Sequence, residues 1–211
     1  MKDLVVLVAD GQMEFAVRGL LARGRSLGFR EVTFDIDVHP AKDPGCRARG
    51  HEFLRPFTRQ YAHALVMHDR EGCGRDDHPR ETLELEAESL LAGSGWKDRA
   101  AVVVIDPELE VWVWSDSPEV AAVLGWTGRQ PALWQWLDQQ GYRALGQAKP
   151  QKPKIALDDA LRSSGKRRSS AIFRQLAERV SIHRCTDPAF LKFKALLQRW
   201  FCSDDRSFAD W

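Results

Sequence analysis

The sequence predicts an α/β fold, with a mainly parallel four-stranded sheet flanked by helices and a helical C-terminal extension. Three observations lead to this prediction. Short apolar runs, typical of buried strands, alternate with amphipathic segments at helical spacing in the first half of the chain. After about residue 105 only helical patterns follow. The 211 residues suffice for one α/β domain with a helical appendage. Strands that alternate with helices favour parallel pairing, with helices on both faces.

Four segments carry the strand pattern. Leu4–Ala9 and Ala100–Ile105 are continuous apolar runs, and His63–His68 is mostly apolar, so we expect all three to be buried on both faces. Glu31–His39 instead alternates apolar and polar residues, which predicts an edge strand.

Helices are predicted between these strands. An amphipathic pattern covers about Gln12–Ser26, and another begins with Pro79 at its first helical position and runs to about Ala92. We expect Pro40–Gly50 to be a loop. A short helix over about His51–Gln60 should be interrupted by Pro56.

The C-terminal part of the chain contains helical patterns and a linker but no strand pattern. A linker composition marks Lys149–Lys154, where prolines and lysines exclude a continuous helix. Amphipathic helices are predicted at residues 131–140, Ile155–Ser164, Ala171–Val180 and Pro188–Phe201. We therefore divide the chain into an α/β domain at 1–126 and a helical extension with a basic segment at 127–211.

The net charge of +1 conceals an asymmetry along the chain. Residues 1–142 hold 16 Lys and Arg against 23 Asp and Glu, whereas residues 143–184 hold 11 against 3. An acidic body with a basic segment favours a phosphate-bearing partner such as nucleic acid.

Composition also suggests where the protein is found. The four cysteines show no C-x-x-C pair and no disulfide spacing, so we expect reduced thiols in a cytoplasmic protein. No apolar stretch approaches the roughly 20 residues of a membrane span, and no membrane partner is expected. The cluster of His, Cys and Asp within His68–His78 lacks the spacing of a zinc site.

Two loops carry the residues that point to chemistry. Asp10 and Glu14 flank Gly11 after the first strand, and Asp69 and Glu71 precede Gly72 after the third. Such positions at the carboxyl ends of strands are where α/β sheets place ligand sites. Carboxylate oxygens suit a hard cation such as Mg²⁺ or Mn²⁺. These acids are our candidates for metal binding and for catalysis of phosphodiester cleavage.

An alternative interpretation of the same acids stays open. Asp10 or Glu14 would lie at the start of a helix, where a carboxylate caps free N–H groups and interacts with the helix dipole. Asp69 and Glu71 would then be ordinary loop acids beside Arg70.

The order of these motifs resembles the Toprim fold of topoisomerases, primases and OLD-type nucleases. ADGQME is similar to the V-E-G-x-[ST]-[DE] signature, with Asp10 at the place of the catalytic Glu. HDREG is similar to D-x-D-x-x-G, with Asp69 as its first acid and Glu71 at the second. IDPELEVWVWSD resembles the E-x-E-x-W stretch of a Toprim-like family in bacterial phage-defence loci, which includes the fourth component of methylation-associated defence systems.

This resemblance covers about residues 1–126. It implies a Mg²⁺-dependent nuclease within an anti-phage defence complex, with nucleic acid and other defence proteins as partners. The alternative is a non-catalytic Toprim-like subunit that binds a protein or nucleic acid there. Asp10 is one methylene shorter than the Glu of the motif and Glu71 is one longer than the Asp, so the site either changes its geometry or has lost catalysis.

Further candidates lie outside the two loops. Glu110 is a candidate metal ligand and Glu108 a possible addition, because both follow the fourth predicted strand; an acid at a helix start is the alternative. Lys166, Arg167 and Arg168 are candidate nucleic-acid contacts. A solvated loop, or docking of these cations to the acidic body of the protein itself, is the alternative. We expect most of the tryptophans between residues 112 and 136 to serve packing rather than base stacking.

Overall fold

In the computed structural model, the chain forms a four-stranded parallel sheet with strand order β2-β1-β3-β4. The structure describes residues 1–115, 117–144, 147–181 and 185–202. The strands are β1 (Lys2–Val8), β2 (Phe34–Val38), β3 (Tyr61–Asp69) and β4 (Ala100–Ile105). The predicted α/β class, the parallel pairing and the edge position of β2 are confirmed.

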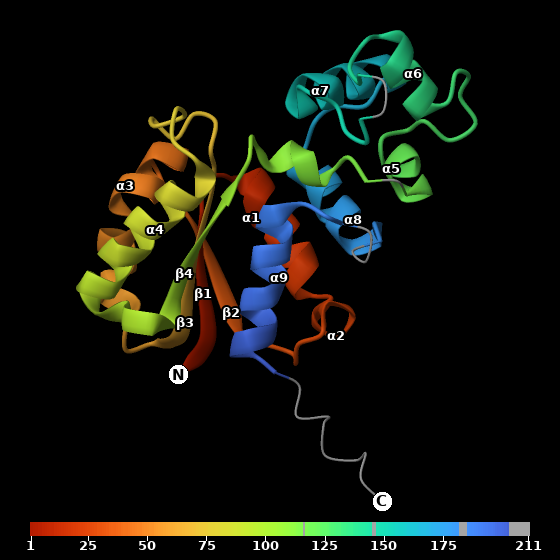
Figure 1. Ribbon diagram of the computed structural model, residues 1–211. Coiled ribbons are helices and arrows are strands. Elements are labelled where there is room, and N and C mark those ends of the chain that lie inside the picture. The colour runs from red at the N-terminus through yellow and green to blue at the C-terminus, as the bar shows by residue number, and fades with distance from the viewer. Residues whose placement is uncertain (116, 145–146, 182–184, 203–211) are drawn as a thin grey trace, which may run out of the picture.

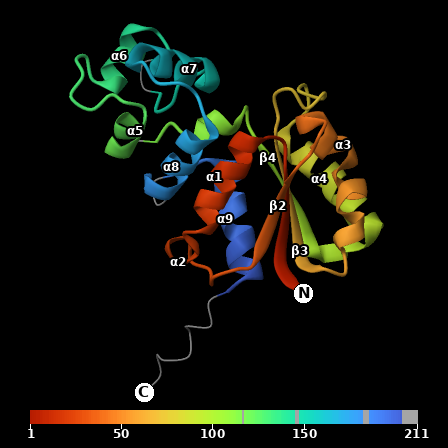
Figure 2. The same ribbon diagram turned by 180° about the vertical axis from the view of Figure 1, so that it is seen from behind.

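Helices cover both faces of the sheet (Figure 1). One face carries α3 (Lys42–Leu54) and α4 (Arg80–Leu91). The opposite face carries α1 (Gly11–Leu21) and α9 (Pro188–Trp200), and α8 (Ser170–Arg179) packs on the outer side of α1, as the reverse view in Figure 2 also shows. One helix from beyond residue 126, α9, therefore helps to cover the sheet, and a second, α8, packs on α1.

Apart from α7, the remaining elements are short. They are α2 (Gly24–Leu27), η1 (Arg55–Phe57), η2 (Ala92–Trp96), η3 (Lys97–Arg99), η4 (Leu109–Trp112), α5 (Pro118–Val123), α6 (Leu133–Gln139) and α7 (Pro153–Ser164). Of these, α5, α6 and α7 lie together beyond the end of the sheet at which β4 finishes (Figure 1).

The predicted loop at Pro40–Gly50 is wrong, because α3 begins at Lys42. The apolar periodicity of the sequence did not predict this helix, because small residues, rather than a stripe of large apolar residues, face the sheet. A Cβ added at Gly50 would lie 3.5 Å from side-chain atoms of Leu7 and Val66, so the helix backbone runs close to the strands.

Two helix boundaries also differ from the prediction. The helix expected to run to Ser26 ends at Leu21 and is followed by the separate α2. Pro79 lies at the N-cap of α4 with extended backbone, one position before the first helical residue. Pro56 does interrupt the helical run as expected, since α3 gives way to a 3₁₀ turn at Arg55.

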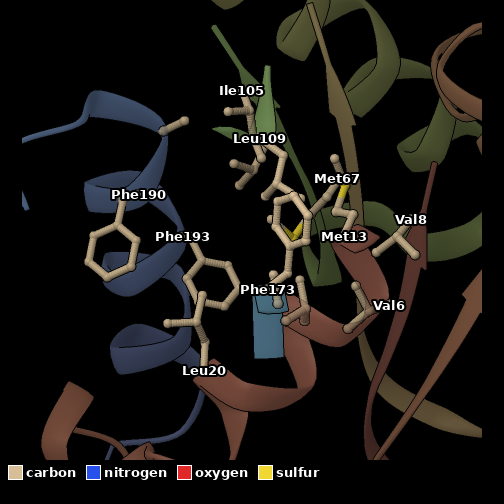
Figure 3. Close-up of a cluster of buried hydrophobic side chains, with 14 of the residues drawn as sticks. Val6, Val8, Met13, Leu20, Met67, Ile105, Leu109, Phe173, Phe190 and Phe193 are labelled. Carbon is tan, nitrogen blue, oxygen red and sulfur yellow. The ribbon is translucent and has the colours of Figure 1, made fainter. Parts of the chain in front are cut away.

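The core on the α1 side is a continuous apolar layer (Figure 3). Met13 and Leu20 from α1 pack with Phe173 of α8, and Phe193 of α9 lies alongside; all four are buried. Burial of one such large side chain contributes about 1.5–3 kcal/mol. The apolar face of α9 thus stabilises its position against the sheet.

The tryptophans serve packing, as predicted. Trp96, Trp114 and Trp126 are buried, and each donates its indole N–H to a backbone carbonyl, at Leu54, Pro153 and Ala160 respectively. A buried indole whose N–H has a partner anchors two segments at once. The last two bonds join the segment after β4 to α7.

Within the described ranges, no helix is both long enough and apolar enough to cross a membrane.

Candidate metal centre

Acidic residues gather where β1, β3 and β4 end. Asp10 follows β1, Asp69 is the last residue of β3, and Glu108 and Glu110 follow β4. The three strands are parallel and adjacent in the sheet, so their carboxyl ends meet at one rim. The predicted convergence of the first two loops depends on the β1–β3 pairing, which the structure confirms.

Asp69 is the most perturbed acid of this rim. Its Oδ1 atom is shielded from solvent and has no hydrogen-bond partner among the described residues. Burial raises the pKa of Asp69 well above its usual range, and repulsion by Asp43, Glu110 and Asp10 raises it further. A buried carboxyl group without a partner is costly when ionised, so this residue is the first candidate for contact with a cation.

Glu110 shows the same feature. Only 2% of this residue is exposed, and one of its oxygens, Oε1, contacts the guanidinium of Arg168. The other oxygen, Oε2, is buried without a hydrogen-bond partner within the described part of the chain. Asp69 and Glu110 therefore each contribute one unpartnered buried oxygen to the same rim.

Two other acids of the rim are helix caps. Asp10 is the N-cap of α1, and its Oδ1 accepts hydrogen bonds from the N–H groups of Gln12 and Met13, both at 2.9 Å. Glu108 accepts a 3.0 Å bond from the backbone N–H of Lys154, in the first turn of α7. The capping interpretation is thus confirmed for Asp10, whose Oδ2 has no such role.

Asp43 also lies at the rim, although the sequence analysis did not predict it as a site residue. It lies in the first turn of α3, and its Oδ1 accepts a 2.8 Å hydrogen bond from the backbone N–H of Asp69. Burial raises the pKa of Asp43, and repulsion by Asp10 adds to the effect. No motif marks this residue, because the segment around it was predicted to be a loop; recognition of α3 would have placed it at a helix start.

The other two predicted site residues lie differently. Glu14 forms an i,i+4 ion pair with Arg18 at 2.9 Å on the surface of α1 and acts electrostatically on Asp37 of β2. Glu71 is exposed, its backbone N–H donates to the carbonyl of Pro107 at 2.9 Å, and its charge acts on Glu108. The structure therefore brings together Asp10, Asp69 and Glu110, leaves Glu14 outside, and places Glu71 at the margin.

The three cations predicted to contact nucleic acid also lie in different environments. Arg168 is turned inward, with hydrogen bonds to Asp158 and Gln12 in addition to its contact with Glu110. Lys166 donates to the carbonyl of Val123 at 2.7 Å. Arg167 is exposed and makes no hydrogen bond or ion pair with any described residue. For Arg168, the alternative prediction is therefore the one that holds: this cation docks to the acidic body of the protein itself.

The rim is not a finished coordination sphere. Within the part of the chain that the structure describes, no three His, Cys, Asp or Glu side chains stand together as a metal-ligand set. What the geometry offers is a pair of carboxyl groups with free oxygens, together with nearby acids that serve as caps. Mg²⁺ commonly binds to one or two carboxylates and keeps several waters.

Comparison with known proteins finds no matching family model, no matching curated protein and no matching solved structure.

Proposed function

We propose that the rim binds a divalent cation, Mg²⁺ or Mn²⁺, through Asp69 and Glu110, and that the protein uses it in phosphodiester chemistry on nucleic acid. The observation that carries this proposal is the pair of buried, unpartnered oxygens, Asp69 Oδ1 and Glu110 Oε2. A buried polar atom without a partner in the chain is often satisfied by a water or an ion.

The chemistry of the donors supports a hard cation. The unpartnered carboxyl oxygens of Asp69 and Glu110 favour Mg²⁺ or Mn²⁺ over zinc or copper. His68 precedes Asp69 in β3; its Nδ1 contacts the carbonyl of Asp69 at 2.8 Å, and its Nε2 is buried without a hydrogen-bond partner among the described residues. Burial lowers the pKa of His68 to about 4, so the imidazole is neutral at neutral pH.

The residues around the pair have separable tasks. Asp10 holds the start of α1 at the rim through its Oδ1 atom. Lys154, whose ammonium lies 3.6 Å from Glu108, is half-exposed and provides a cation for a phosphate oxygen. The bound ion would supply activation of a water and neutralisation of charge on the phosphate. We propose nucleic acid as the substrate because the two acidic loops resemble the motifs of Toprim nucleases.

A titration with Mn²⁺ tests this proposal. We expect the whole chain to bind Mn²⁺ in calorimetry, and the Asp69→Asn and Glu110→Gln variants each to lose at least tenfold in affinity, because each removes one of two anionic ligands. Glu71→Gln and Glu14→Gln are the matched controls, since both side chains lie outside the pair. Equal losses in the controls, or no binding by the unaltered chain, would contradict the proposal.

Turnover is a separate measurement. We expect weak or partner-dependent cleavage of nucleic acid, because the rim must still be completed by substrate and water. The cleavage should depend on Mg²⁺ or Mn²⁺ and disappear in Asp69→Asn. Rapid cleavage of duplex DNA by the isolated chain would show that the rim is more complete than its geometry indicates.

A second candidate function is a non-catalytic subunit that binds a protein partner or nucleic acid. The observation that favours it is the occupation of the rim by internal roles: Asp10 and Glu108 cap helices, and Arg168 neutralises Glu110. This candidate predicts no metal affinity and stable co-purification with a partner.

Membership of a bacterial anti-phage defence system is the biological setting that we propose for either function. It is supported by the resemblance of the three motifs in residues 1–126. Deletion of the gene from a defence locus, followed by phage challenge, tests it; unchanged protection would contradict it.

A further inference from the structure

Arg168 occupies an unusual place for a residue of a basic segment. It lies between α7 and α8, and only 21% of its side chain is exposed. The guanidinium contacts Glu110, donates to Asp158 at 2.9 Å and lies 5.2 Å from the centre of the Phe173 ring. It is therefore a cation inserted beside the acidic rim.

Arg168 compensates the rim only in part. Its contact with Glu110 uses Oε1, whereas Oε2 of the same carboxyl group stays buried and unpartnered. Oδ1 of Asp69, which acts electrostatically on Glu110, is unpartnered as well. Arg168 beside Glu110 and Lys154 beside Glu108 thus leave two buried oxygens without a partner, which a divalent ion would contact.

The backbone around Arg168 allows the side chain to leave. The segment from Gly165 to Ser169 has no regular secondary structure, and Gly165 has a left-handed φ of +76° at the end of α7. A guanidinium on a long side chain in such a connection can change its partner without displacement of either helix. Exposed Arg167 is its neighbour on the same connection.

We propose that Arg168 is the internal counter-ion of the metal-free rim, and that a divalent cation competes with it for Glu110. When the cation binds, Arg168 leaves Glu110 and offers its guanidinium edge to a phosphate group of the substrate. Metal binding and phosphate binding then strengthen each other, as reciprocal linkage requires. This inference rests on the proposed metal site and adds the order in which its charges are exchanged.

Calorimetric titration with Mn²⁺ tests the competition. We expect Arg168→Ala to bind Mn²⁺ about tenfold more tightly than the unaltered chain, because a positive charge in contact with a ligand is removed. Arg168→Lys, which retains the charge but not the forked donors, should stay within about threefold. Arg162→Ala, which removes an exposed arginine of α7 paired with Asp159, is the matched control and should not change the affinity.

Whether Arg168→Ala binds Mn²⁺ more tightly or more weakly than the unaltered chain decides between competition and a purely structural contact. A contact that merely holds the rim in shape predicts weaker Mn²⁺ binding in Arg168→Ala, and that result, or an unchanged affinity, would overturn the inference while leaving the metal site intact. Absence of Mn²⁺ binding in both the unaltered chain and Arg168→Ala would overturn the proposed function and this inference with it. Mn²⁺ binding by Arg168→Ala but not by the unaltered chain would also contradict the proposed function, which requires the unaltered rim to bind the ion.

A second measurement follows the side chain and its segment. Hydrogen exchange at residues 165–169 should become faster on addition of Mn²⁺, since the contact with Glu110 is lost. Subsequent addition of a short single-stranded oligonucleotide should slow it again. Mn²⁺-dependent protection of this segment in the absence of nucleic acid would contradict the release of Arg168.

Discussion

Oδ1 of Asp43 accepts a hydrogen bond from the backbone N–H of Asp69 at 2.8 Å. This bond joins the first turn of α3 to the last residue of β3. It fixes the end of the strand and also holds two carboxyl groups near each other in a buried place. Burial raises the pKa of both carboxyl groups, and repulsion by Asp43 raises the pKa of Asp69 further.

The first prediction concerns the stability of metal-free protein. Burial raises the folded-state pKa of Asp69 above its unfolded value of about 3.9, so between the two values the folded state binds more protons. Stability therefore falls as pH rises through that window. Asp69→Asn carries no such charge, and we expect it to be more stable than the unaltered chain by about 1–2 kcal/mol at neutral pH.

Urea unfolding in the presence of a chelator, from pH 4 to pH 8, measures this difference. The advantage of Asp69→Asn should be small near pH 4 and grow as pH rises. Added Mn²⁺ should stabilise the unaltered chain and not the variant. A difference that stays constant with pH would show that the Asp69 charge is compensated in the folded state.

The second prediction concerns the edge of the sheet formed by β4, which helices cover. Glu84 of α4 accepts a 3.0 Å hydrogen bond from the N–H of Val104 in β4, and it also pairs with Arg80 and with Lys192 of α9. Glu84 thus covers an edge N–H that no strand pairs and links helices from both faces of the sheet. We expect Glu84→Ala to lower the free energy of unfolding by about 3 kcal/mol, because it leaves buried partners unsatisfied.

Glu86→Ala is the matched control for that variant. Glu86 lies on the same helix and pairs with Arg75 at the surface, so its loss should cost no more than about 1 kcal/mol. Denaturation in urea compares the two. Similar costs for both variants would show that the cover of the β4 edge contributes little. Light scattering should also reveal more association of Glu84→Ala.

The third prediction concerns the packing of α1 against α8. A Cβ added at Gly19 would lie 2.8 Å from the Cβ of Ala177 and 3.0 Å from the carbonyl oxygen of Arg174. Gly→Ala in a helix normally stabilises by about 1 kcal/mol, but here the helices must separate, and we expect a net loss of about 1–3 kcal/mol. Gly93→Ala meets no atom within 4 Å and serves as the control. Thermal unfolding that ranks Gly19→Ala at or above the control would contradict this close contact.

The fourth prediction concerns nucleic-acid contacts in the basic segment. Of its three adjacent cations, Arg167 is the exposed one without a described partner, while Lys166 donates to a carbonyl oxygen. If the segment contacts phosphate, Arg167→Ala should weaken binding of single-stranded DNA and reduce the salt slope by about 1. Fluorescence anisotropy across a salt series measures this. An unchanged slope would exclude Arg167 from the contact.

Several features of the fold were predictable from local patterns. The apolar runs at Leu4–Ala9 and Ala100–Ile105 identified strands that are buried on both faces, since such a strand must be apolar at every position. The second of them, β4, lies at one edge of the sheet but is covered by α4 on one face and α9 on the other. Alternation in Glu31–His39 identified β2 at the opposite edge. The helix α3 was missed because Gly45, Cys46 and Gly50 form its buried side, and small residues carry little periodic signal.

The sequence by itself determined that acids follow buried parallel strands, and it predicted that Asp10, Glu14, Asp69 and Glu71 meet at one rim, with Glu110 as a further ligand. The structure leaves Glu14 outside this group. Only the tertiary structure decided which oxygens remain free there. One oxygen of Asp10 accepts hydrogen bonds from N–H groups of α1. Asp43 lies on a helix that no sequence motif predicted, and it accepts a hydrogen bond from Asp69. Arg168 contacts Glu110, which lies 58 positions earlier in the chain. Strand patterns are local because burial imposes them residue by residue, whereas the partner of a buried charge is selected by contacts that form only when distant segments pack together.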